Sequence, residues 1–385
     1  MQTLHQTEVI VIGGGAVGCS IAYQLARRGK DVTLVDKAEP GAGTSTKNFG
    51  LVWVHTKEPY TYMELSLRSS LLWPKLVEAL GEDVDLRQPG GIAPCLTEDD
   101  YERAAALIER QRRSPLFQGK MIPPDEVFAM QPGITRDLVG ASWSPHDGSV
   151  NWIKWTHALA RGCERAGVRM FHQTEVQAIE RDGDNCVTGV LTDRGRIVAP
   201  HVVCAAGPWS KGVAALVDLQ IDFFPQKGQI LITEATDMIC PMTMDSVRQE
   251  PHGQFYMGTT HEDVGFDWST TAEAYKAIRD YAARLVPATK DLRVVRHFAG
   301  LRPMPRDGKP ILGPVPHVPG FYMATSHSGI TLSPIHGKII SDLIVEGETD
   351  IPLGAYDPLR FMQTDRAAGD RTGPVPPDPL TPRIL

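Results

Sequence analysis

The amino-acid sequence predicts an α/β fold in which a parallel sheet with packed helices is joined to a second, α+β domain built on an antiparallel sheet. Three observations support this prediction. An apolar run at 9–12 leads through a glycine cluster into a helical pattern and a second apolar run at 32–35. Another apolar strand at 202–206 lies far along the chain. Alternating apolar residues at 223–234 and 253–260 are typical of antiparallel strands.

The first of these units matches a dinucleotide-binding pattern. In G-x-G-x-x-G, Gly13 allows a sharp turn, Gly15 allows the backbone to approach a pyrophosphate, and Gly18 allows the helix to pack closely on the strand. Unpaired N–H groups at the helix N-terminus then face the phosphates. Asp36 ends the second strand, where its carboxylate can accept hydrogen bonds from an adenosine ribose. Lys37 is expected either to contact the adenosine side or to be a solvated surface lysine.

Composition and charge favour a globular enzyme over a nucleic-acid-binding protein. The 385 residues suffice for two domains, and the net charge of −7 gives no general attraction to nucleic acid or to an anionic membrane. The six cysteines are scattered without metal-ligand spacing, so we expect free thiols in a reducing compartment. The polar start of the chain and the lack of a long apolar run predict neither a signal peptide nor a membrane span, and we expect a cytoplasmic protein.

The remaining elements follow from apolar spacing and from glycine and proline breaks. Apolar spacing predicts helices at 60–80, 99–113 and 152–166. Strand-like segments are expected at 86–96, 169–172, 176–181, 186–192 and 195–200. A further helix is expected to end before Pro287, and a strand at 294–300 is expected to return towards the first domain.

Three further segments are expected beside the dinucleotide. The strand at 202–206 ends at Ala206 and Gly207, as a second pass of the chain beneath the same ligand would, so the first domain is predicted to be discontinuous. Ser333 as N-cap with Pro334 in the first helical position predicts a helix start whose partial positive charge points at 329–332. The loop 39–50 is rich in hydroxyl groups that can face phosphate, and an ordinary solvent loop is the alternative.

Several motifs occur in the same order in one known family. They are GGGAVG with Asp36, GTSTKNFG, VVCAAGPWS, GLRP, DGKPILG and SHSGITLSP. In these motifs the chain resembles the flavin-dependent amine oxidoreductases of the D-amino-acid oxidase superfamily, especially the branch of glycine oxidase, sarcosine oxidase and opine or hydroxyproline dehydrogenase. The resemblance implies an FAD-binding Rossmann-like domain of the GR2 type at 1–85, 146–218 and 298–365. It also implies a discontinuous substrate domain at 86–145 and 219–297, followed by a proline-rich tail at 366–385.

The resemblance implies that FAD is the dinucleotide and that its attachment is non-covalent. Some sarcosine oxidases attach flavin through a cysteine after GLRP, whereas no cysteine follows Cys240 here. The residues implied in FAD binding are Gly13, Gly15, Ala16, Val17, Gly18, Asp36, Lys37, Thr44, Ser45, Asn48, Phe49, Gly50, Leu51, Val176, Ala206, Gly207, Trp209, Arg302, Ser328, Gly329, Ile330, Thr331 and Leu332. Backbone N–H groups in the last part of this set would stabilise the negative charge of reduced flavin.

By the same resemblance, Arg302 of GLRP binds the substrate carboxylate. An arginine fork suits a carboxylate because two parallel charge-assisted hydrogen bonds fix its orientation. A salt bridge that locks the domain interface is the alternative. Tyr256 is expected to face the substrate or to be a core residue. His55 and His327 are candidates for a direct role, against the alternative of hydrogen-bonded structural residues. No metal is implied.

The implied reaction is hydride transfer from the carbon that bears the amine to flavin N5, which yields an imine that water hydrolyses. The expected small-molecule substrate is a D-amino acid, an N-alkyl glycine, an imino acid or an opine. Two alternatives stay open: oxidation of a 2-hydroxy acid by the same fold, and a flavin subunit that is active only with a partner. The electron acceptor is expected to be oxygen, a partner protein or a quinone, and the chain a homo-oligomer or a hetero-oligomeric subunit.

Overall fold

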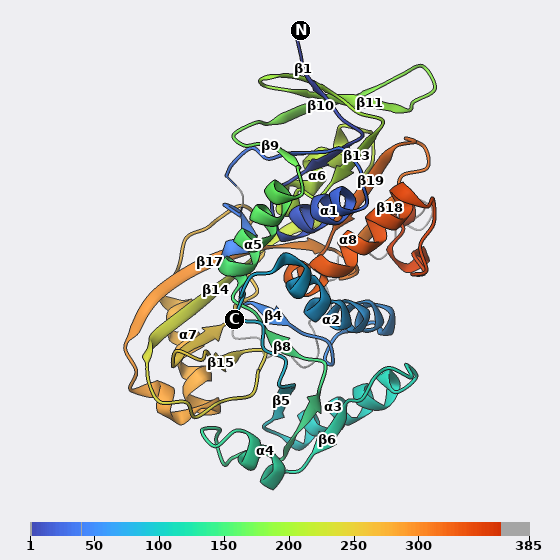
Figure 1. The fold of residues 1–385 in the computed structure, drawn as a ribbon. Helices are drawn as coiled ribbons and strands as arrows, with labels where there is room; N and C mark the ends of the chain where they lie inside the picture. Colours follow the sequence, from blue (N-terminus) through green and yellow to red (C-terminus); the bar gives the residue numbers. More distant parts are fainter. Residues whose placement is uncertain (1, 40, 363–385) are drawn as a thin grey trace.

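The computed structural model describes residues 2–39 and 41–362 and is built around a six-stranded sheet (Figure 1). The strand order is β18-β19-β13-β2-β3-β9, in which β18 is antiparallel and the others are parallel. These strands are β2 (Val9–Ile12), β3 (Val32–Val35), β9 (Arg169–Phe171), β13 (His201–Cys204), β18 (Ile311–Pro314) and β19 (Phe321–Thr325). Because β13 pairs directly with β2, the later strand lies beside the glycine turn. The predicted α/β fold is confirmed.

Alternation along β2 explains why both faces of this sheet are covered. Val9 and Val11 join a core cluster with the main helices, whereas Ile10 and Ile12 join a cluster on the opposite face, because successive side chains of a strand point to opposite sides. The helices of the first face are α1 (Ala16–Arg27), α2 (Tyr60–Leu80), α5 (Trp152–Arg165) and α8 (Gly329–Val345). The second face carries α6 (Ser210–Ala215) and a four-stranded sheet of β1 (Thr3–Gln6), β12 (Gly195–Val198), β11 (Val187–Thr192) and β10 (Val176–Arg181).

A second region contains the antiparallel sheets, at the lower left and bottom of Figure 1. The larger sheet has the order β15-β16-β14-β17, formed by β14 (Phe223–Ala235), β15 (Val247–Gln249), β16 (Gln254–Gly258) and β17 (Val294–Pro305). The smaller sheet has the order β5-β7-β6, formed by β5 (Gly91–Cys95), β6 (Lys120–Ile122) and β7 (Gly140–Ser144). The accompanying helices are α3 (Glu98–Gln111), α4 (Pro124–Met130) and α7 (Ala272–Leu285). The long β17 extends beyond the expected strand at 294–300 and carries GLRP within it.

The predicted start of the last helix is wrong. α8 begins at Gly329, and Pro334 lies inside it rather than at its first position. A proline inside a helix leaves the carbonyl four residues earlier without its usual donor. Here the hydroxyl of Ser333 donates to the carbonyl oxygen of Ile330 at 2.9 Å, which satisfies that acceptor. The helix N-terminus therefore lies at 329–332 itself.

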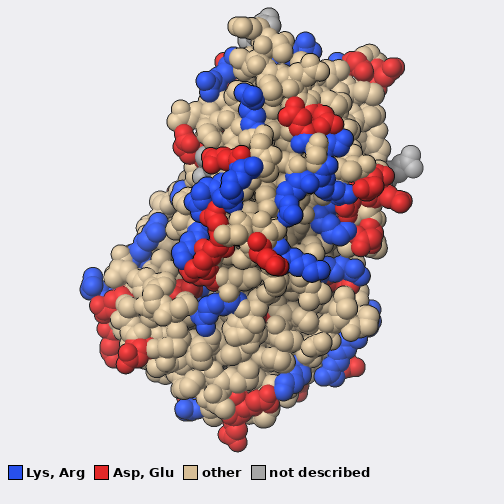
Figure 2. Space-filling model, in the orientation of Figure 1, with Lys and Arg blue, Asp and Glu red and all other residues tan. Residues whose placement is uncertain are grey.

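The division into the two predicted domains stays a prediction. All strands of the six-stranded sheet fall in 1–85, 146–218 and 298–365, but β17 crosses the boundary at 298. The tail 366–385, with its proline-rich part, lies outside the described residues. Within residues 2–39 and 41–362, none of the helices combines the length and apolar character needed to cross a bilayer. On the face in Figure 2, acidic and basic side chains are intermingled rather than separated by sign.

Candidate active site

A cavity of about 670 Å³ lies at the carboxyl ends of β2, β3 and β13, where ligands of open α/β sheets bind. The loop from Asp36 to Leu51, β17 and the N-terminus of α8 complete its wall. The predicted residues that line it are Gly13, Gly15, Val17, Asp36, Lys37, Thr44, Ser45, Asn48, Phe49, Gly50, Leu51, Val176, Ala206, Gly207, Trp209, Arg302, His327, Ser328, Gly329, Ile330 and Thr331. Ala16, Gly18 and Leu332 are buried in the elements behind this wall.

The three glycines of the turn have different surroundings. Gly13 has a φ of +114°, and a Cβ there would lie 2.4 Å from the carbonyl oxygen of Ala205 on the neighbouring strand. A Cβ on Gly18 would lie 1.9 Å from the carbonyl oxygen of Gly13, so the helix can approach the turn only without a side chain. A Cβ on Gly15 would meet only the Ser45 side chain, at 2.9 Å from its Oγ. Gly13 and Gly18 are thus needed for packing, whereas Gly15 leaves space in the cavity.

Asp36 shapes the glycine turn as well as lining the cavity. Its Oδ2 accepts a hydrogen bond from Gly14 N at 2.5 Å, and its Oδ1 accepts one from Ala38 N at 2.8 Å. A carboxylate has about four acceptor positions. Two acceptor positions are therefore left for hydroxyl groups of a ligand.

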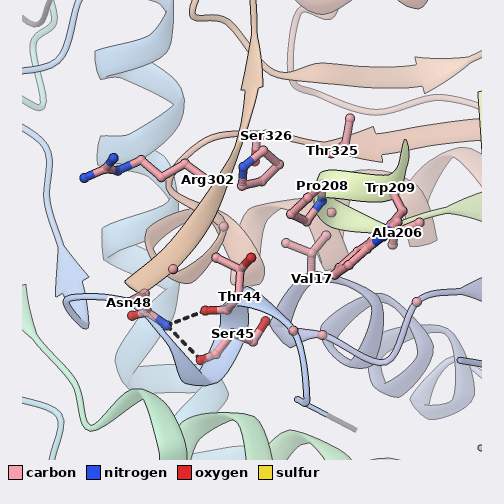
Figure 3. Close-up of a pocket in the computed structure, with 18 of the residues that line it drawn as sticks. Val17, Thr44, Ser45, Asn48, Ala206, Pro208, Trp209, Arg302, Thr325 and Ser326 are labelled. Atoms are coloured by element: carbon pink, nitrogen blue, oxygen red, sulfur yellow. Dashed lines mark hydrogen bonds between the residues drawn. The ribbon is translucent and has the colours of Figure 1, made fainter. Parts of the chain in front are cut away.

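The hydroxyl-rich loop is held in one conformation by its own side chains (Figure 3). Asn48 donates to the carbonyl oxygens of Thr44 and Ser45 at 3.2 and 2.7 Å, and its Oδ1 accepts from Gly50 N at 2.7 Å. The hydroxyl of Thr44 donates to Leu301 O at 2.5 Å, which ties the loop to β17. Ser45 Oγ accepts from Ala16 N at 2.9 Å. Ser45 thus lies at the N-terminus of α1, where helix N–H groups favour an anion.

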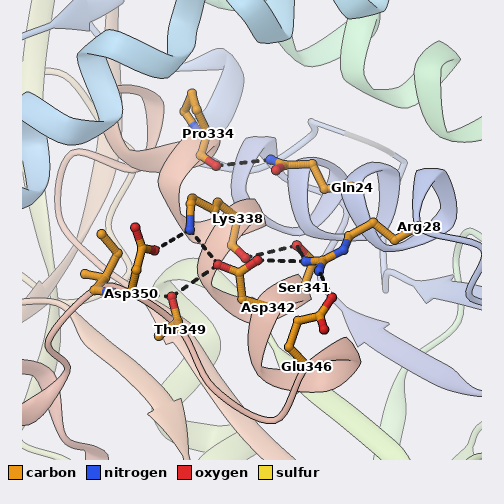
Figure 4. A network of polar contacts seen from close by, with 10 residues as sticks. Gln24, Arg28, Pro334, Lys338, Ser341, Asp342, Glu346, Thr349 and Asp350 are labelled. Atoms are coloured by element: carbon orange, nitrogen blue, oxygen red, sulfur yellow. Dashed lines mark hydrogen bonds and ion pairs between the residues drawn. The ribbon is translucent and has the colours of Figure 1, made fainter.

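α1 and α8 pack against each other, and the N-termini of both helices reach the cavity. Polar contacts between these two helices are shown in Figure 4. Arg28 at the end of α1 pairs with Asp342 and Glu346 of α8 at 2.7 and 2.6 Å. Gln24 donates to the carbonyl oxygen of Pro334 at 3.1 Å. Partly exposed ion pairs contribute little individually, but several pairs on one seam fix the relative position of the helices.

Arg302 lies in β17 and points in Figure 3 away from Ala206 and Trp209. Its Nη1 donates to Thr260 O at 3.0 Å, and its Nη2 donates to Thr259 Oγ1. Burial lowers the pKa of the guanidinium to about 10, so it stays charged at neutral pH. No carboxylate of the described residues forms an ion pair with it; the nearby Glu262 pairs instead with Lys227 at 3.0 Å. The alternative of an interface salt bridge is therefore not seen among these residues.

His327 lines the same cavity as two cationic side chains, Lys57 and Arg302. Its Nδ1 is 3.4 Å from Tyr62 Oη and 3.3 Å from Ser328 Oγ. Lys57 Nζ donates to Ser328 Oγ at 2.5 Å and to Tyr62 Oη at 3.4 Å. Burial, followed by the charges of Lys57 and Arg302, lowers the pKa of His327 well below its usual range. His327 is therefore neutral at neutral pH.

The other two predicted catalytic residues do not line this cavity. His55 is fully buried, with its Nδ1 on the Asp147 carboxylate and its Nε2 3.0 Å from Ser142 Oγ. The Tyr256 ring packs against Trp152, with 5.2 Å between ring centres. These contacts favour the alternatives of a structural histidine and a core tyrosine.

Sequence reasoning missed several residues of the cavity wall, namely Trp53, Lys57, Asp245, Thr259 and His261. Lys57 lies three residues before the first residue of α2, between this helix and the predicted loop 39–50, so its position was the one available signal. Asp245, Thr259 and His261 come from the connections around β15 and β16, and nothing in their local sequence marks them. Among residues 2–39 and 41–362, no cluster of His, Cys, Asp or Glu could hold a metal ion.

The shape and donors of this cavity fit a dinucleotide. Gly15 presents no side chain towards it, the first turn of α1 and the start of α8 present N–H groups, and Asp36 supplies free acceptor positions at the strand end. Lys37 lies over the Trp209 ring at 4.2 Å, so both flank the same part of the wall.

Comparison with known proteins agrees with this geometry. The profile of the DAO family, described as FAD dependent oxidoreductase, matches residues 8–343. A subunit of the opine oxidase of Agrobacterium tumefaciens is 31% identical over 93% of this chain and 98% of its own length. Glycine oxidase of Pseudomonas aeruginosa is 32% identical over 91% of this chain and 98% of its own length. The crystal structure of L-proline dehydrogenase from P. horikoshii has a TM-score of 0.86, with 27% identity over 93% and 98% of the two chains. The chain therefore belongs to the DAO family and is an oxidoreductase that uses FAD.

Proposed function

We propose that this protein oxidises the C–N bond of a substrate that carries a carboxylate, such as a D-amino acid, an N-alkyl glycine, an imino acid or an opine. One observation carries the proposal: the Arg302 guanidinium lines the same cavity as the glycine turn, and no carboxylate of the described residues pairs with it. A bound carboxylate would supply that partner through charge-assisted hydrogen bonds. The names of the relatives, an opine oxidase and a glycine oxidase, support the same class of substrate.

FAD would be held without a covalent bond along this cavity. The glycine turn, Asp36 and Ser45 would hold its ADP half, and Ala206 with Gly207 would lie along the diphosphate. The N-terminus of α8 would face the flavin end, where its unpaired N–H groups stabilise negative charge. When bound, FAD supplies the acceptor of the two electrons that leave the substrate.

Arg302 and His327 of the same cavity would bind and orient the substrate for this oxidation. The substrate loses a hydride from carbon and a proton from nitrogen, so that the C–N bond becomes C=N, and water then splits the imine into a carbonyl compound and an amine. Arg302 would fix the carboxylate and hence the position of the neighbouring C–H bond. His327, neutral at neutral pH, adds no charge that would repel the amine, and its lowered pKa makes it a poor proton acceptor.

Anaerobic mixing of the purified protein with amino acids, secondary amines and 2-hydroxy acids tests the proposal through bleaching of the flavin band. Arg302→Ala should raise the substrate concentration for half-maximal flavin reduction by about tenfold or more, because it removes a charged hydrogen-bond partner. The absorbance spectrum of the bound flavin should be unchanged. Arg306→Ala is the matched control, because Arg306 follows the same strand but pairs with Asp222 outside the cavity. Equal affinities of Arg302→Ala and wild-type protein for carboxylate substrates would overturn the assignment.

Two alternatives are separated by the same experiment. Bleaching by 2-hydroxy acids alone would select oxidation of a hydroxyl-bearing carbon. Bleaching only after a partner protein is added would select a subunit role, which the relative that is a subunit of opine oxidase favours. Readmitting air after bleaching would then show whether oxygen is the acceptor or a partner protein or quinone is required.

A further inference from the structure

The connection between β16 and α7, residues 259–271, reaches from the second region to the wall of the cofactor cavity. Phe266 stacks on the Trp209 ring, with 5.5 Å between the ring centres and 28° between the ring planes. Lys47 Nζ lies over the Trp268 ring, 4.3 Å from its centre. Trp209 and Lys47 line the cavity, whereas Phe266 and Trp268 do not. The connection therefore supports the cavity wall from outside.

Trp209 and Lys47 stand on opposite sides of a seam in this wall. Trp209 follows β13 (Figure 3), and Lys47 belongs to the hydroxyl-rich loop. The two parts of the chain meet closely, since a Cβ on Gly43 of the loop would lie 3.5 Å from the Trp209 ring. Because Phe266 contacts one side of the seam and Trp268 contacts the other, the connection bridges the two sides.

β14 anchors the connection beside this exposed bridge. Lys227 of β14 is 2% exposed, and its Nζ pairs with Glu262 at 3.0 Å and with Asp267 at 2.8 Å. Gln229 of the same strand donates to Glu262 at 2.9 Å. Phe266 is 51% exposed, so its ring can leave Trp209 through movement of one half-exposed side chain. The anchors on β14 can stay in place during that movement.

We propose that residues 259–271 gate the entry and release of FAD, which passes through the seam between Trp209 and Lys47. Phe266 and Trp268 hold the two sides of the seam together. Since neither ring lines the cavity, these rings act on the barrier to passage of FAD rather than on its contacts. The inference concerns the cofactor and does not depend on which substrate is oxidised.

The test measures both rates of FAD exchange without substrate. Mixing apoprotein with FAD and following the flavin fluorescence gives the association rate. Mixing holoprotein with an excess of another FAD-binding apoprotein, which traps released FAD, gives the release rate. The variants are Phe266→Ala and the conservative Phe266→Tyr. Tyr275→Ala is the matched control, because Tyr275 of α7 is 38% exposed and packs on His297 outside the cavity, with 5.7 Å between ring centres.

Phe266→Ala should raise the association rate and the release rate alike by about fivefold or more, because it removes an aromatic pair that keeps the seam closed. The ratio of the two rates, which is the Kd of FAD, should stay within about twofold, since a side chain outside the cavity does not favour bound over free cofactor. Phe266→Tyr should restore the wild-type rates, and Tyr275→Ala should leave both rates unchanged.

Two results would overturn the inference. Unchanged rates in Phe266→Ala would show that FAD passes elsewhere. A faster release alone, with a matching loss of affinity, would make Phe266 a binding contact rather than part of a gate. Circular dichroism and the urea midpoint of each apoprotein show whether the variant is folded. If Phe266→Ala is not folded, Trp268→Leu applies the same test from the other side of the seam, with the same rise expected in both rates.

Discussion

Gly18→Ala tests the packing on which the whole cofactor cavity depends. The added Cβ would lie 1.9 Å from the carbonyl oxygen of Gly13, whereas contacts of this kind are normally longer than 3 Å. The obstacle is backbone of the turn itself, so α1 or the turn must move by about 1 Å or more. Overpacking of this size costs about 1–3 kcal/mol. The gain in helix propensity from glycine to alanine is about 1 kcal/mol. Because the obstacle is rigid backbone, we expect an overpacking cost at the upper end of this range. After the gain in helix propensity is subtracted, the free energy of unfolding should fall by about 2 kcal/mol.

The same displacement should weaken FAD binding, because the N-terminus of α1 moves relative to the strand ends. Urea unfolding of the apoprotein, followed by circular dichroism, measures the loss of stability. Titration of the apoprotein with FAD measures the loss of FAD affinity. Gly15→Ala should change stability by less than about 1 kcal/mol but lower FAD affinity about tenfold, because its Cβ enters the cavity and meets only Ser45. Gly183→Ala, in open space, is the control. Wild-type stability and FAD affinity in Gly18→Ala would refute the reasoning.

Two further predictions concern Asp36 and His336. Asp36→Ala should lower FAD retention at low FAD concentration without changing substrate preference, because the hydrogen bonds of Asp36 go to the glycine turn and to Ala38, not to Arg302. A variant that stays fully loaded with FAD in an ultrafiltration assay would contradict this. Burial lowers the pKa of His336 from 6.5 to about 3, so the unfolded chain binds the proton first and stability falls as pH drops below 6.5. Between pH 6.5 and about pH 4.5 this amounts to about 2 kcal/mol. Urea unfolding at these two pH values measures the loss of stability, and His336→Leu should remove the part of it that comes from His336. If the stability of this variant depends on pH as that of the wild type does, the prediction is wrong.

Local patterns in the sequence were sufficient for the unit at 9–36. Strand, turn and helix there depend on residues close in the chain, and the three glycines are needed for contacts within the same unit or with the adjacent strand. The returning strand was also predictable, because an apolar run that ends in Ala-Gly is itself a local signal. The start of α8 was not predictable in this way: Ser333 and Pro334 match a helix start, but the serine hydroxyl bonds within the helix and compensates for the proline.

What the sequence by itself determined is the fold class and the dinucleotide turn, since both depend on short-range spacing. Most of the other residues predicted to bind the cofactor were named only through the resemblance to a known family, and their role stays a prediction. Only the tertiary structure decided which polar residues share the cavity. His55 lies in the packed interior, Tyr256 is partly buried against Trp152, and Lys57 contacts Ser328, 271 positions further along the chain. Such contacts arise because α2, β17 and α8 pack around one sheet edge, and side chains far apart in sequence meet only when that packing forms.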